Sequence, residues 1–262
     1  MTVWIDQPIW PAHGRLFAHL VSDTSYDELH AVARAARLHP RSFDGDHYDV
    51  PQVRWQDAVD AGATPTTGVE LARRLNASGL RLRKRKRDRG VRRVLDVAFP
   101  NGASDVDLVA SDDPLDPSRV LAAMVFVRDR RGDFVVVHSV RRGEWGSPGG
   151  WREEDETPIE NAVRETLEET GLRLRLADVF ACGYERFTPR TADNLFTSER
   201  PFLQVFRTRL DEVRPSLTDG DDGIHETRWV TPEEYAELCG HLFWWPLAVE
   251  VFPDLRGLAR HP

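Results

Sequence analysis

The chain has 262 residues and a formal net charge of −8, so it exceeds one typical domain and is too acidic for a general nucleic-acid binder. Hydrophobic residues make up 40% of the sequence, which suffices for packed cores. Cys182 and Cys239 give neither a disulfide framework nor a zinc-binding spacing, which favours a reducing cytoplasm. The first ten residues lack the pattern of a signal peptide, and the longest apolar run, 120–127, is too short to cross a membrane.

Residues 1–81 are expected to form a small α/β domain. A short strand is expected at 2–5. Helices are expected after Ser25, Pro51 and Thr67, because each of these residues suits a helix start and apolar residues follow at helical spacing. Helices separated by short extended pieces favour a small α/β domain.

Acidic residues and histidines gather in the loops of this first domain, where function tends to sit. We single out five as a hypothetical site that could bind a metal or perform acid–base chemistry: His13, Asp23, Asp44, Asp46 and His47. The alternative is that each residue stabilises a turn through a nearby backbone group, since the spacings match no known metal motif. The segments MTVWIDQPIWPAHGRLFAHLVSDTS and FDGDHYDVP resemble the bacterial family DUF4031 of unknown function. This resemblance covers residues 1–85 and implies no activity.

Residues 82–117 are expected to be a linker with one strand at 91–99. The basic run RLRKRKRDRGVRR at 81–93 could attract phosphates, but a block of like charge more often stays open and solvated. No aromatic residue interleaves the run, which weakens an interpretation as a single-strand binder. The following piece, 101–118, is rich in Asp, Pro, Gly and Ser. Binding to nucleic acid is therefore not expected.

Residues 118–254 are expected to form a second domain that begins with a hairpin. Strands at 119–128 and 134–140 are joined by a turn at 130–133. Further strands are expected at 176–188, 201–210 and 228–230. The polar insert at 189–200 is expected to form a rim of the substrate pocket, and a capped helix is expected from Thr231.

The stretch GWREEDETPIENAVRETLEETGL at 150–172 predicts a helix with an acidic face. Thr157 suits the N-cap, Glu160 completes a capping box and Gly171 suits the C-terminal stop. Three further glutamates stand at positions i, i+3 and i+4 and so share one helix face: Glu165, Glu168 and Glu169. Like charges on adjacent turns repel, whereas Mg²⁺ takes carboxylate oxygens and keeps waters for a phosphate substrate. The alternative is a solvated acidic helix face.

The same stretch resembles the Nudix box of the Nudix hydrolases in every charged and glycine position, and Thr166 is a mild departure at a usually aliphatic position. The matching residues are Gly150, Glu156, Arg164, Glu165, Glu168, Glu169, Gly171 and Leu172. The resemblance implies that Glu165, Glu168, Glu169 and the Gly150 carbonyl hold Mg²⁺ or Mn²⁺. It also implies that Arg164 orients Glu165 and that Glu156 braces the loop against the helix.

Residues around the box are candidates for substrate binding. Arg141 and Arg142 could meet phosphate, and Trp145 could stack on a base or pack under the loop. Asp222 and Glu226 lie in an acidic loop where similar proteins often place a further acid or base, although a flexible loop would look the same. The aromatic tail at 243–247 could cover the core or form a homodimer contact.

The sequence therefore predicts two α/β units, the second a mixed-sheet α/β/α sandwich resembling the Nudix fold. The expected activity is metal-dependent hydrolysis of the diphosphate linkage in a nucleoside diphosphate derivative, a small-molecule nucleotide substrate. Two alternatives stay open: a nucleotide-sensing regulatory module without turnover, and a nucleic-acid-directed enzyme that uses the basic run at 81–93.

Overall fold

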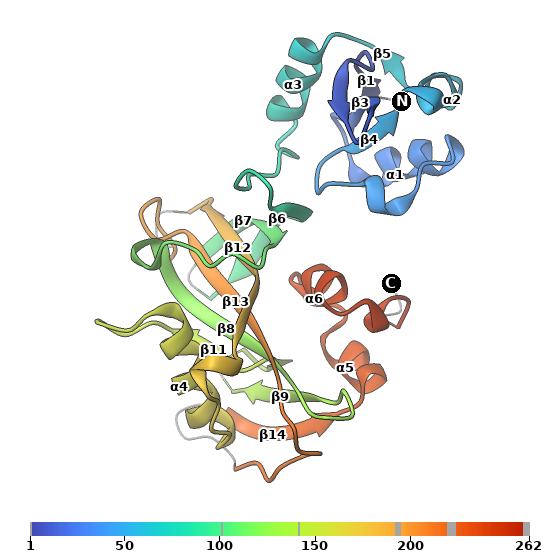
Figure 1. Ribbon diagram of the computed structural model, residues 1–262. Helices are drawn as coiled ribbons and strands as arrows, with labels where there is room; N and C mark the ends of the chain where they lie inside the picture. The colour runs from blue at the N-terminus through green and yellow to red at the C-terminus, as the bar shows by residue number, and fades with distance from the viewer. Residues whose placement is uncertain (1, 101, 141, 192–194, 219–223, 259–262) are drawn as a thin grey trace. The chain divides into compact units, whose positions relative to one another are not determined.

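The structure is a computed structural model, and it describes residues 2–100, 102–140, 142–191, 195–218 and 224–258. The chain divides into two compact units, Met1–Arg93 and Val94–Pro262 (Figure 1). The division falls inside β6 (Arg89–Phe99), which joins the sheet of the second unit through its neighbour β7 (Gly102–Ala110). No helix of the described residues is both long and apolar enough to span a membrane.

The first unit is a small sheet with helices. Its elements in chain order are β1 (Val3–Ile5), β2 (Trp10–Ala12), β3 (Arg15–Ser22), α1 (Tyr26–Ala35), η1 (Pro40–Ser42), β4 (Tyr48–Pro51), η2 (Gln52–Arg54), α2 (Trp55–Asp60), β5 (Thr64–Pro65) and α3 (Gly68–Ala77). Strand β3 is central, because β1, β2 and β4 all pair with it in antiparallel fashion. Strand β5 extends the sheet in parallel beside β1.

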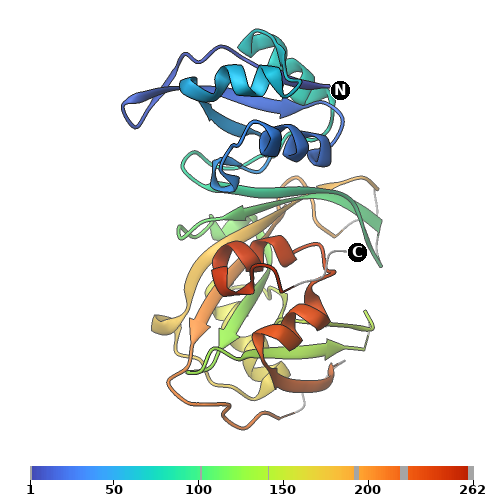
Figure 2. The same ribbon diagram turned by 90° about the vertical axis from the view of Figure 1, so that its right-hand side faces the viewer.

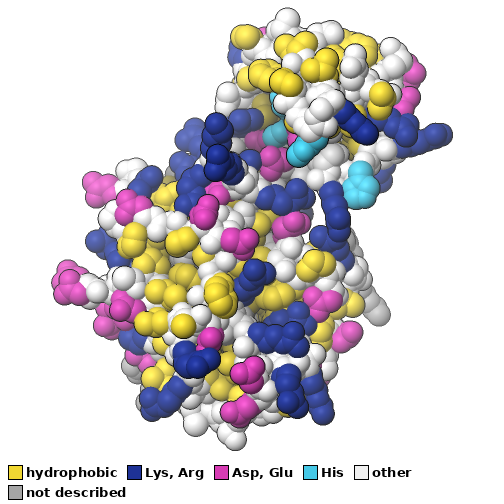
Figure 3. Space-filling view, in the orientation of Figure 1, with side chains coloured by type: hydrophobic (Ala, Val, Ile, Leu, Met, Phe, Trp, Pro, Cys, Tyr) yellow, Lys and Arg dark blue, Asp and Glu magenta, His cyan; other side chains and the backbone are white. Residues whose placement is uncertain are grey.

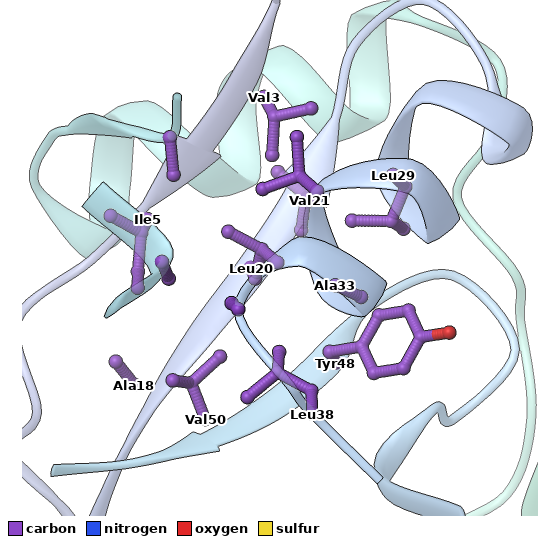
Figure 4. Packing of buried hydrophobic residues seen from close by; sticks show 14 of the residues in the cluster. Val3, Ile5, Ala18, Leu20, Val21, Leu29, Ala33, Leu38, Tyr48 and Val50 are labelled. Carbon is purple, nitrogen blue, oxygen red and sulfur yellow. The ribbon is translucent and has the colours of Figure 1, made fainter. Parts of the chain in front are cut away.

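The core of the first unit packs this sheet against its helices, with α1 as a principal contributor. Alternate residues of β3 and β4 are buried, and the apolar stripe of α1 packs on them. Figure 4 shows these side chains converging; those labelled there are Val3, Ile5, Ala18, Leu20, Val21, Leu29, Ala33, Leu38, Tyr48 and Val50. The expected helix starts are confirmed, since the side chains of Ser25 and Thr67 accept hydrogen bonds from the backbone three residues later.

The second unit is a mixed sheet between helices. After β7 its elements are η3 (Pro117–Arg119), β8 (Val120–Arg128), β9 (Phe134–Ser139), β10 (Glu144–Gly146), β11 (Gly149–Trp151), α4 (Pro158–Thr170), η4 (Leu176–Asp178), β12 (Phe180–Pro189), β13 (Phe202–Arg209), β14 (Ile224–Val230), α5 (Pro232–Cys239), α6 (Trp245–Val251) and η5 (Pro253–Leu255). Within the described residues the strand order is β10-β9-β8-β13-β12-β7-β6, with β11 paired to β8 and β14 to β9. The β8–β13 pair is parallel, so the sheet is mixed.

Helix α4 covers one face of this sheet, and α5 and α6 cover the other (Figures 1 and 2). Successive residues of β8 point to opposite faces, so Val125 packs on the α4 side and Phe126 on the side of Trp244. The predicted α/β/α sandwich is therefore confirmed. Both Cys182 and Cys239 are buried as free thiols.

The expectation of an open linker over 82–117 needs correction, because most of this segment is strand. Strand β7 pairs with β12 and buries Val106, Leu108 and Val109. Its acidic residues do not prevent packing, since their charges are paired with basic ones: Asp105 with Arg190 at 2.6 Å and Asp107 with Arg186 at 3.4 Å.

The basic run is paired in the same way. Lys84 contacts Asp44 at 2.9 Å and Arg85 contacts Asp88 at 2.8 Å. Neighbouring carboxylates therefore neutralise part of the charge that, in sequence, favours an open chain. The domain limits at 81 and 118 stay predictions.

Candidate active site

Helix α4 is fixed at both ends by the residues that the sequence indicates. Thr157 and Glu160 form the reciprocal capping box, and Gly171 ends the helix in the left-handed conformation with φ of 74°. The departure at Thr166 is accommodated, because its buried hydroxyl donates to the Ala162 carbonyl at 2.7 Å. The buried side of α4 packs on β8, and its residues Glu165 and Glu169 lie beside β11.

Strand β11 passes so close to α4 that Gly150 directly faces the end of the Glu165 side chain. A Cβ at Gly150 would lie 2.5 Å from the carboxylate of Glu165. The backbone N–H of Gly149 donates to Glu169 at 2.9 Å. The two carboxylates of the helix and the glycine backbone therefore line one small space.

Arg164 joins the glutamates of the loop and the helix. Its guanidinium contacts Glu156 at 2.6 Å, Glu165 at 3.0 Å and Glu168 at 2.7 Å. It also donates to the Trp151 carbonyl at 3.1 Å, which ties the helix to β11. These hydrogen bonds hold the pKa of Glu156 below its usual range. The structure thus brings these four side chains together, and their catalytic roles stay predictions.

Negative charge is concentrated beyond what Arg164 offsets. Burial raises the pKa of Glu165, and burial together with the charge of Glu165 raises the pKa of Glu169 to about 8. Oxygen donors at high negative charge are the ligands that Mg²⁺ and Mn²⁺ prefer, so the donor set fits such an ion.

One rearrangement would complete the set. Among the described residues, the carboxylates of Glu165, Glu168 and Glu169 do not offer oxygens that all lie within 4.8 Å of one another. Glu168 instead pairs with Arg164 at 2.7 Å, and its side chain is 54% exposed. Glu168 would have to turn toward Glu165 to share an ion with it.

A cavity of about 550 Å³ lies beside β11 and is walled mainly by aromatic and aliphatic side chains. Phe187 and Phe196 stack at 3.6 Å between ring centroids, and Trp151 packs against Phe196 at 5.5 Å. Phe196 belongs to the polar insert, which does form part of the rim as expected. A different cavity of about 410 Å³, lined by Arg128, Arg131, Arg175 and Arg207 among others, contains none of the predicted site residues.

Of the predicted substrate residues, Arg142 and Trp145 line the cavity of 550 Å³. The Trp145 ring packs against His138 at 5.1 Å and under the guanidinium of Arg228 at 4.3 Å. Trp145 is thus packed between neighbouring side chains and lines the cavity, and its stacking on a base stays a prediction. Glu226 is an exposed residue of β14 in register with His138, and its role stays a prediction. The predicted site residues Arg141 and Asp222 lie outside the described residues.

Glu185 is a residue of the cavity wall that was not among the residues predicted from the sequence. It lies on β12, lines the cavity and is 1% exposed. Its Oε1 has no hydrogen-bond partner among the described residues, and burial raises its pKa to about 8. The sequence feature that could have indicated Glu185 is an acidic residue between Tyr184 and Phe187, in a strand whose other residues are mostly of the kind found buried.

The five-residue site expected in the first unit does not form as predicted. Asp23 accepts a hydrogen bond from Trp4 at 2.8 Å and pairs with Arg74, and His13 lies in the exposed turn between β2 and β3. Asp44 accepts from the Gly90 N–H at 2.7 Å, as a turn-stabilising residue would.

Of the five side chains, only those of Asp46 and His47 contact each other directly, at 2.6 Å. Burial alone would lower the pKa of His47, but hydrogen bonds to Asp46 and Asp49 raise it to about 9. The other neighbours of His47 are Asp49 and His19, which the five-residue prediction did not include.

Comparison with known proteins places both units. Residues 118–253 match the family model of the NUDIX domain, and residues 3–78 match DUF4031, described as a protein of unknown function. Phosphatase NudJ of Escherichia coli (strain K12) is 33% identical over 134 residues, which cover 50% of this chain and 80% of NudJ. A MutT-like protein of Streptomyces ambofaciens is 29% identical over 142 residues, covering 54% of this chain and 80% of that protein.

The match to a solved structure of the Bacillus subtilis pyrophosphohydrolase BsRppH covers 63% of this chain and 98% of the BsRppH chain, with 16% identity and a TM-score of 0.46. The family assignment depends on the sequence matches instead. The NUDIX model spans about half of the chain and includes every residue of the box at 150–172. The chain therefore belongs to the Nudix hydrolase family.

Proposed function

We propose that the second unit hydrolyses the diphosphate linkage of a nucleoside diphosphate derivative, with Mg²⁺ or Mn²⁺ held by Glu165, Glu168, Glu169 and the Gly150 carbonyl. The observation that carries this proposal is the position of the α4 carboxylates, which face the Gly149–Gly150 backbone at the wall of the aromatic cavity. Such an ion, when bound, offsets the charge that builds on the phosphate oxygens and activates the attacking water.

The chain's own residues prepare this site. Arg164 holds Glu156 and Glu165 in place and neutralises part of their charge before a cation arrives. Its bond to the more exposed Glu168 is the one that would open, because that side chain loses least by moving through solvent. The Gly149 N–H orients Glu169. Glu226 and Glu169 are the candidates for accepting a proton from water.

The cavity is suited to the nucleoside or other organic part of the substrate. Its aromatic walls offer stacking surfaces, and Arg142 at the same cavity could meet a phosphate oxygen. Glu185 is the buried carboxyl among them, so it would recognise a polar edge of the ligand by a hydrogen bond. A ligand lacking that polar edge would leave the buried carboxyl unpaired and bind more weakly.

The two other functions have less support. A regulatory module without turnover has no need of three neighbouring carboxylates on one helix, because their mutual repulsion opposes folding. A nucleic-acid-directed enzyme would need an accessible basic run, but Lys84 and Arg85 are paired with acidic neighbours.

The test is a panel of nucleotide derivatives incubated with Mg²⁺ or Mn²⁺, with release of monophosphate or pyrophosphate as the measurement. We expect at least one derivative to be hydrolysed by the wild type. Glu169→Gln should lose more activity than the roughly 10–100-fold typical of changes next to metal ligands, because a charged donor is removed without a change of shape. Glu237→Gln, an exposed glutamate of α5, is the matched control. Wild-type rates in Glu169→Gln would refute the assignment.

A further inference from the structure

A compact group of two histidines and an aspartate lies on the first unit, outside the Nudix domain. His19 of β3 and Asp49 of β4 are directly opposite in the antiparallel pair, so their side chains share one face of the sheet. His47 stands two residues before Asp49 and therefore joins the same face. This face is opposite to the one that carries Leu20 and Val50 into the core.

The ligand atoms of the three residues converge. Asp49 Oδ1 lies 3.5 Å from His47 Nε2 and 4.0 Å from His19 Nε2. One ligand atom from each residue lies within 4.8 Å of the others, and no other set of three His, Cys, Asp or Glu in the described residues does so. Two ligands each about 2.1 Å from one ion lie roughly 3.4 Å apart in tetrahedral geometry, so small side-chain shifts suffice.

Each imidazole is oriented by a second, buried carboxylate. Asp6 contacts His19 Nδ1 at 3.0 Å, and Asp46 contacts His47 Nδ1 at 2.6 Å. The side chains of Asp6 and Asp46 are each 3% exposed. Because an ionised carboxylate only accepts, each Nδ1 is the donor, and each Nε2 is left to face Asp49. A carboxylate behind the imidazole is the arrangement that fixes metal-binding histidines in proteins.

The supporting carboxylates are themselves held in place. Asp6 accepts from the backbone N–H of His19 at 2.6 Å and from Trp10 Nε1 at 3.0 Å. Asp46 accepts from the backbone N–H of Leu82 at 2.8 Å. The imidazoles are thus positioned before any ligand arrives, and this lowers the entropy that binding must offset.

We propose that His19, His47 and Asp49 bind one divalent transition-metal ion, of which Zn²⁺ is the representative. Two imidazole nitrogens with one carboxylate suit Zn²⁺ and similar ions, whereas Mg²⁺ takes oxygen ligands almost alone. Asp49 is 47% exposed and His19 is 29% exposed, so solvent reaches the site. Figure 3 shows histidine side chains at the surface of this unit. Three protein ligands with solvent access leave a coordination position open, as in catalytic rather than structural zinc sites.

The rival account is an ion pair without metal. In that case a proton on His47 supplies the positive charge that Asp46 and Asp49 surround. Both accounts place positive charge among the same carboxylates, but only the metal account predicts stoichiometric zinc that depends on His19 as well. The experiment below separates them.

The full chain carrying Glu169→Gln, which weakens the separate site on α4, is stripped of metal with a chelator. It is then dialysed against Zn²⁺ in excess Mg²⁺, and bound zinc is counted by mass spectrometry while calorimetry gives the affinity. We expect one zinc per chain, its loss in His47→Ala and Asp49→Asn, and its retention in His13→Ala, a histidine of the same unit outside the group. Asp46→Asn should weaken Zn²⁺ binding roughly 10–100-fold, as loss of a partner behind a ligand does.

Thermal unfolding keeps the test valid if a variant folds poorly. Zn²⁺ should raise the melting temperature of the parent chain by mass action and leave that of Asp49→Asn unchanged, a substitution at a half-exposed position. Zinc that persists in the His19→Ala, His47→Ala double variant would overturn the proposal, and so would a parent chain that retains no zinc. Neither result would bear on hydrolysis by the second unit.

Discussion

At the scale of single residues, Glu185 lies in an environment that is unusual for a glutamate, because its side chain is buried. Its carboxyl is buried between the β7 and β13 neighbours Leu108 and Leu203. Ionisation there is unfavourable because the charge would leave water with no compensating partner among the described residues. Burial accordingly raises its pKa from the ordinary 4.5 to about 8.

This shift makes the free energy of unfolding depend on pH. The unfolded chain releases the Glu185 proton near pH 4.5 and the folded chain near pH 8, so the stabilising contribution is complete below pH 4.5 and is lost as pH rises to about 8. A difference of one between the folded and unfolded pKa values corresponds to roughly 1.4 kcal/mol in the free energy of unfolding. Glu185→Gln should remove this pH dependence, because glutamine does not titrate. We therefore expect urea unfolding to show that the variant becomes increasingly more stable than the wild type as the pH rises from 5 to 8. A difference between the two proteins that stays constant over this range would contradict the buried carboxyl.

At the scale of elements, the close approach of β11 to α4 determines the geometry of the carboxylates. The strand reaches the helix because Gly150, which faces Glu165, has no side chain, and the capping box and Gly171 fix the length of the helix. The contacts of Arg164 with Glu156 and Trp151 then lock the loop to both elements. The site therefore depends on a short distance between two backbones as much as on charge.

The Gly150→Ala substitution tests this dependence. The new Cβ would stand 2.5 Å from the Glu165 carboxylate, so that side chain must move away from the shared space. We expect Mn²⁺ affinity, followed by electron paramagnetic resonance, to fall roughly 10–100-fold. Stability should change little, because the displaced group is the end of a flexible side chain. Gly146→Ala is the control, since nothing lies within 4 Å of its added Cβ. Equal Mn²⁺ affinities for the two variants would argue against Gly150 and Glu165 as neighbours of the ion.

At the scale of the whole molecule, the hydrolase domain extends toward the N-terminus beyond its family match. Strand β7 pairs with β12 from Gly183 to Pro189, and β6 contributes Val97, Ala98 and Phe99 to the cavity wall. A chain that starts at residue 118 would leave β12 as an open edge and would lack that wall.

Two fragments distinguish these roles. We expect fragment 88–262 to fold as a monomer with the Tm and KM of the full chain for its best substrate. Fragment 118–262 should aggregate, or fold with a lower Tm and a raised KM, because its edge strand and cavity are uncovered. Circular dichroism, size-exclusion chromatography and steady-state kinetics provide the comparison. Matching Tm and KM for the two fragments would show that β6 and β7 are dispensable.

The sequence by itself determined what depends on local spacing. Helix α4, its cap at Thr157 and its end at Gly171 follow from residues within a turn of each other. The shared face of Glu165, Glu168 and Glu169 follows from helical periodicity in the same way. The apolar runs of β8 and β9 and the start of α1 at Ser25 are equally local signals.

Only the tertiary structure decided what depends on strand register and on charges distant in sequence. His19 meets Asp49 because β3 and β4 pair at one register among several, and a shift by one residue would turn His19 into the core. The charge of the acidic and basic stretches in 82–117 predicts an open chain from sequence alone. In the folded protein these charges are paired with residues distant in sequence, such as Arg190 and Asp44. Glu185 looks like any strand glutamate in sequence, because its burial is produced by the neighbouring strands and the cavity rather than by its own neighbours in the chain.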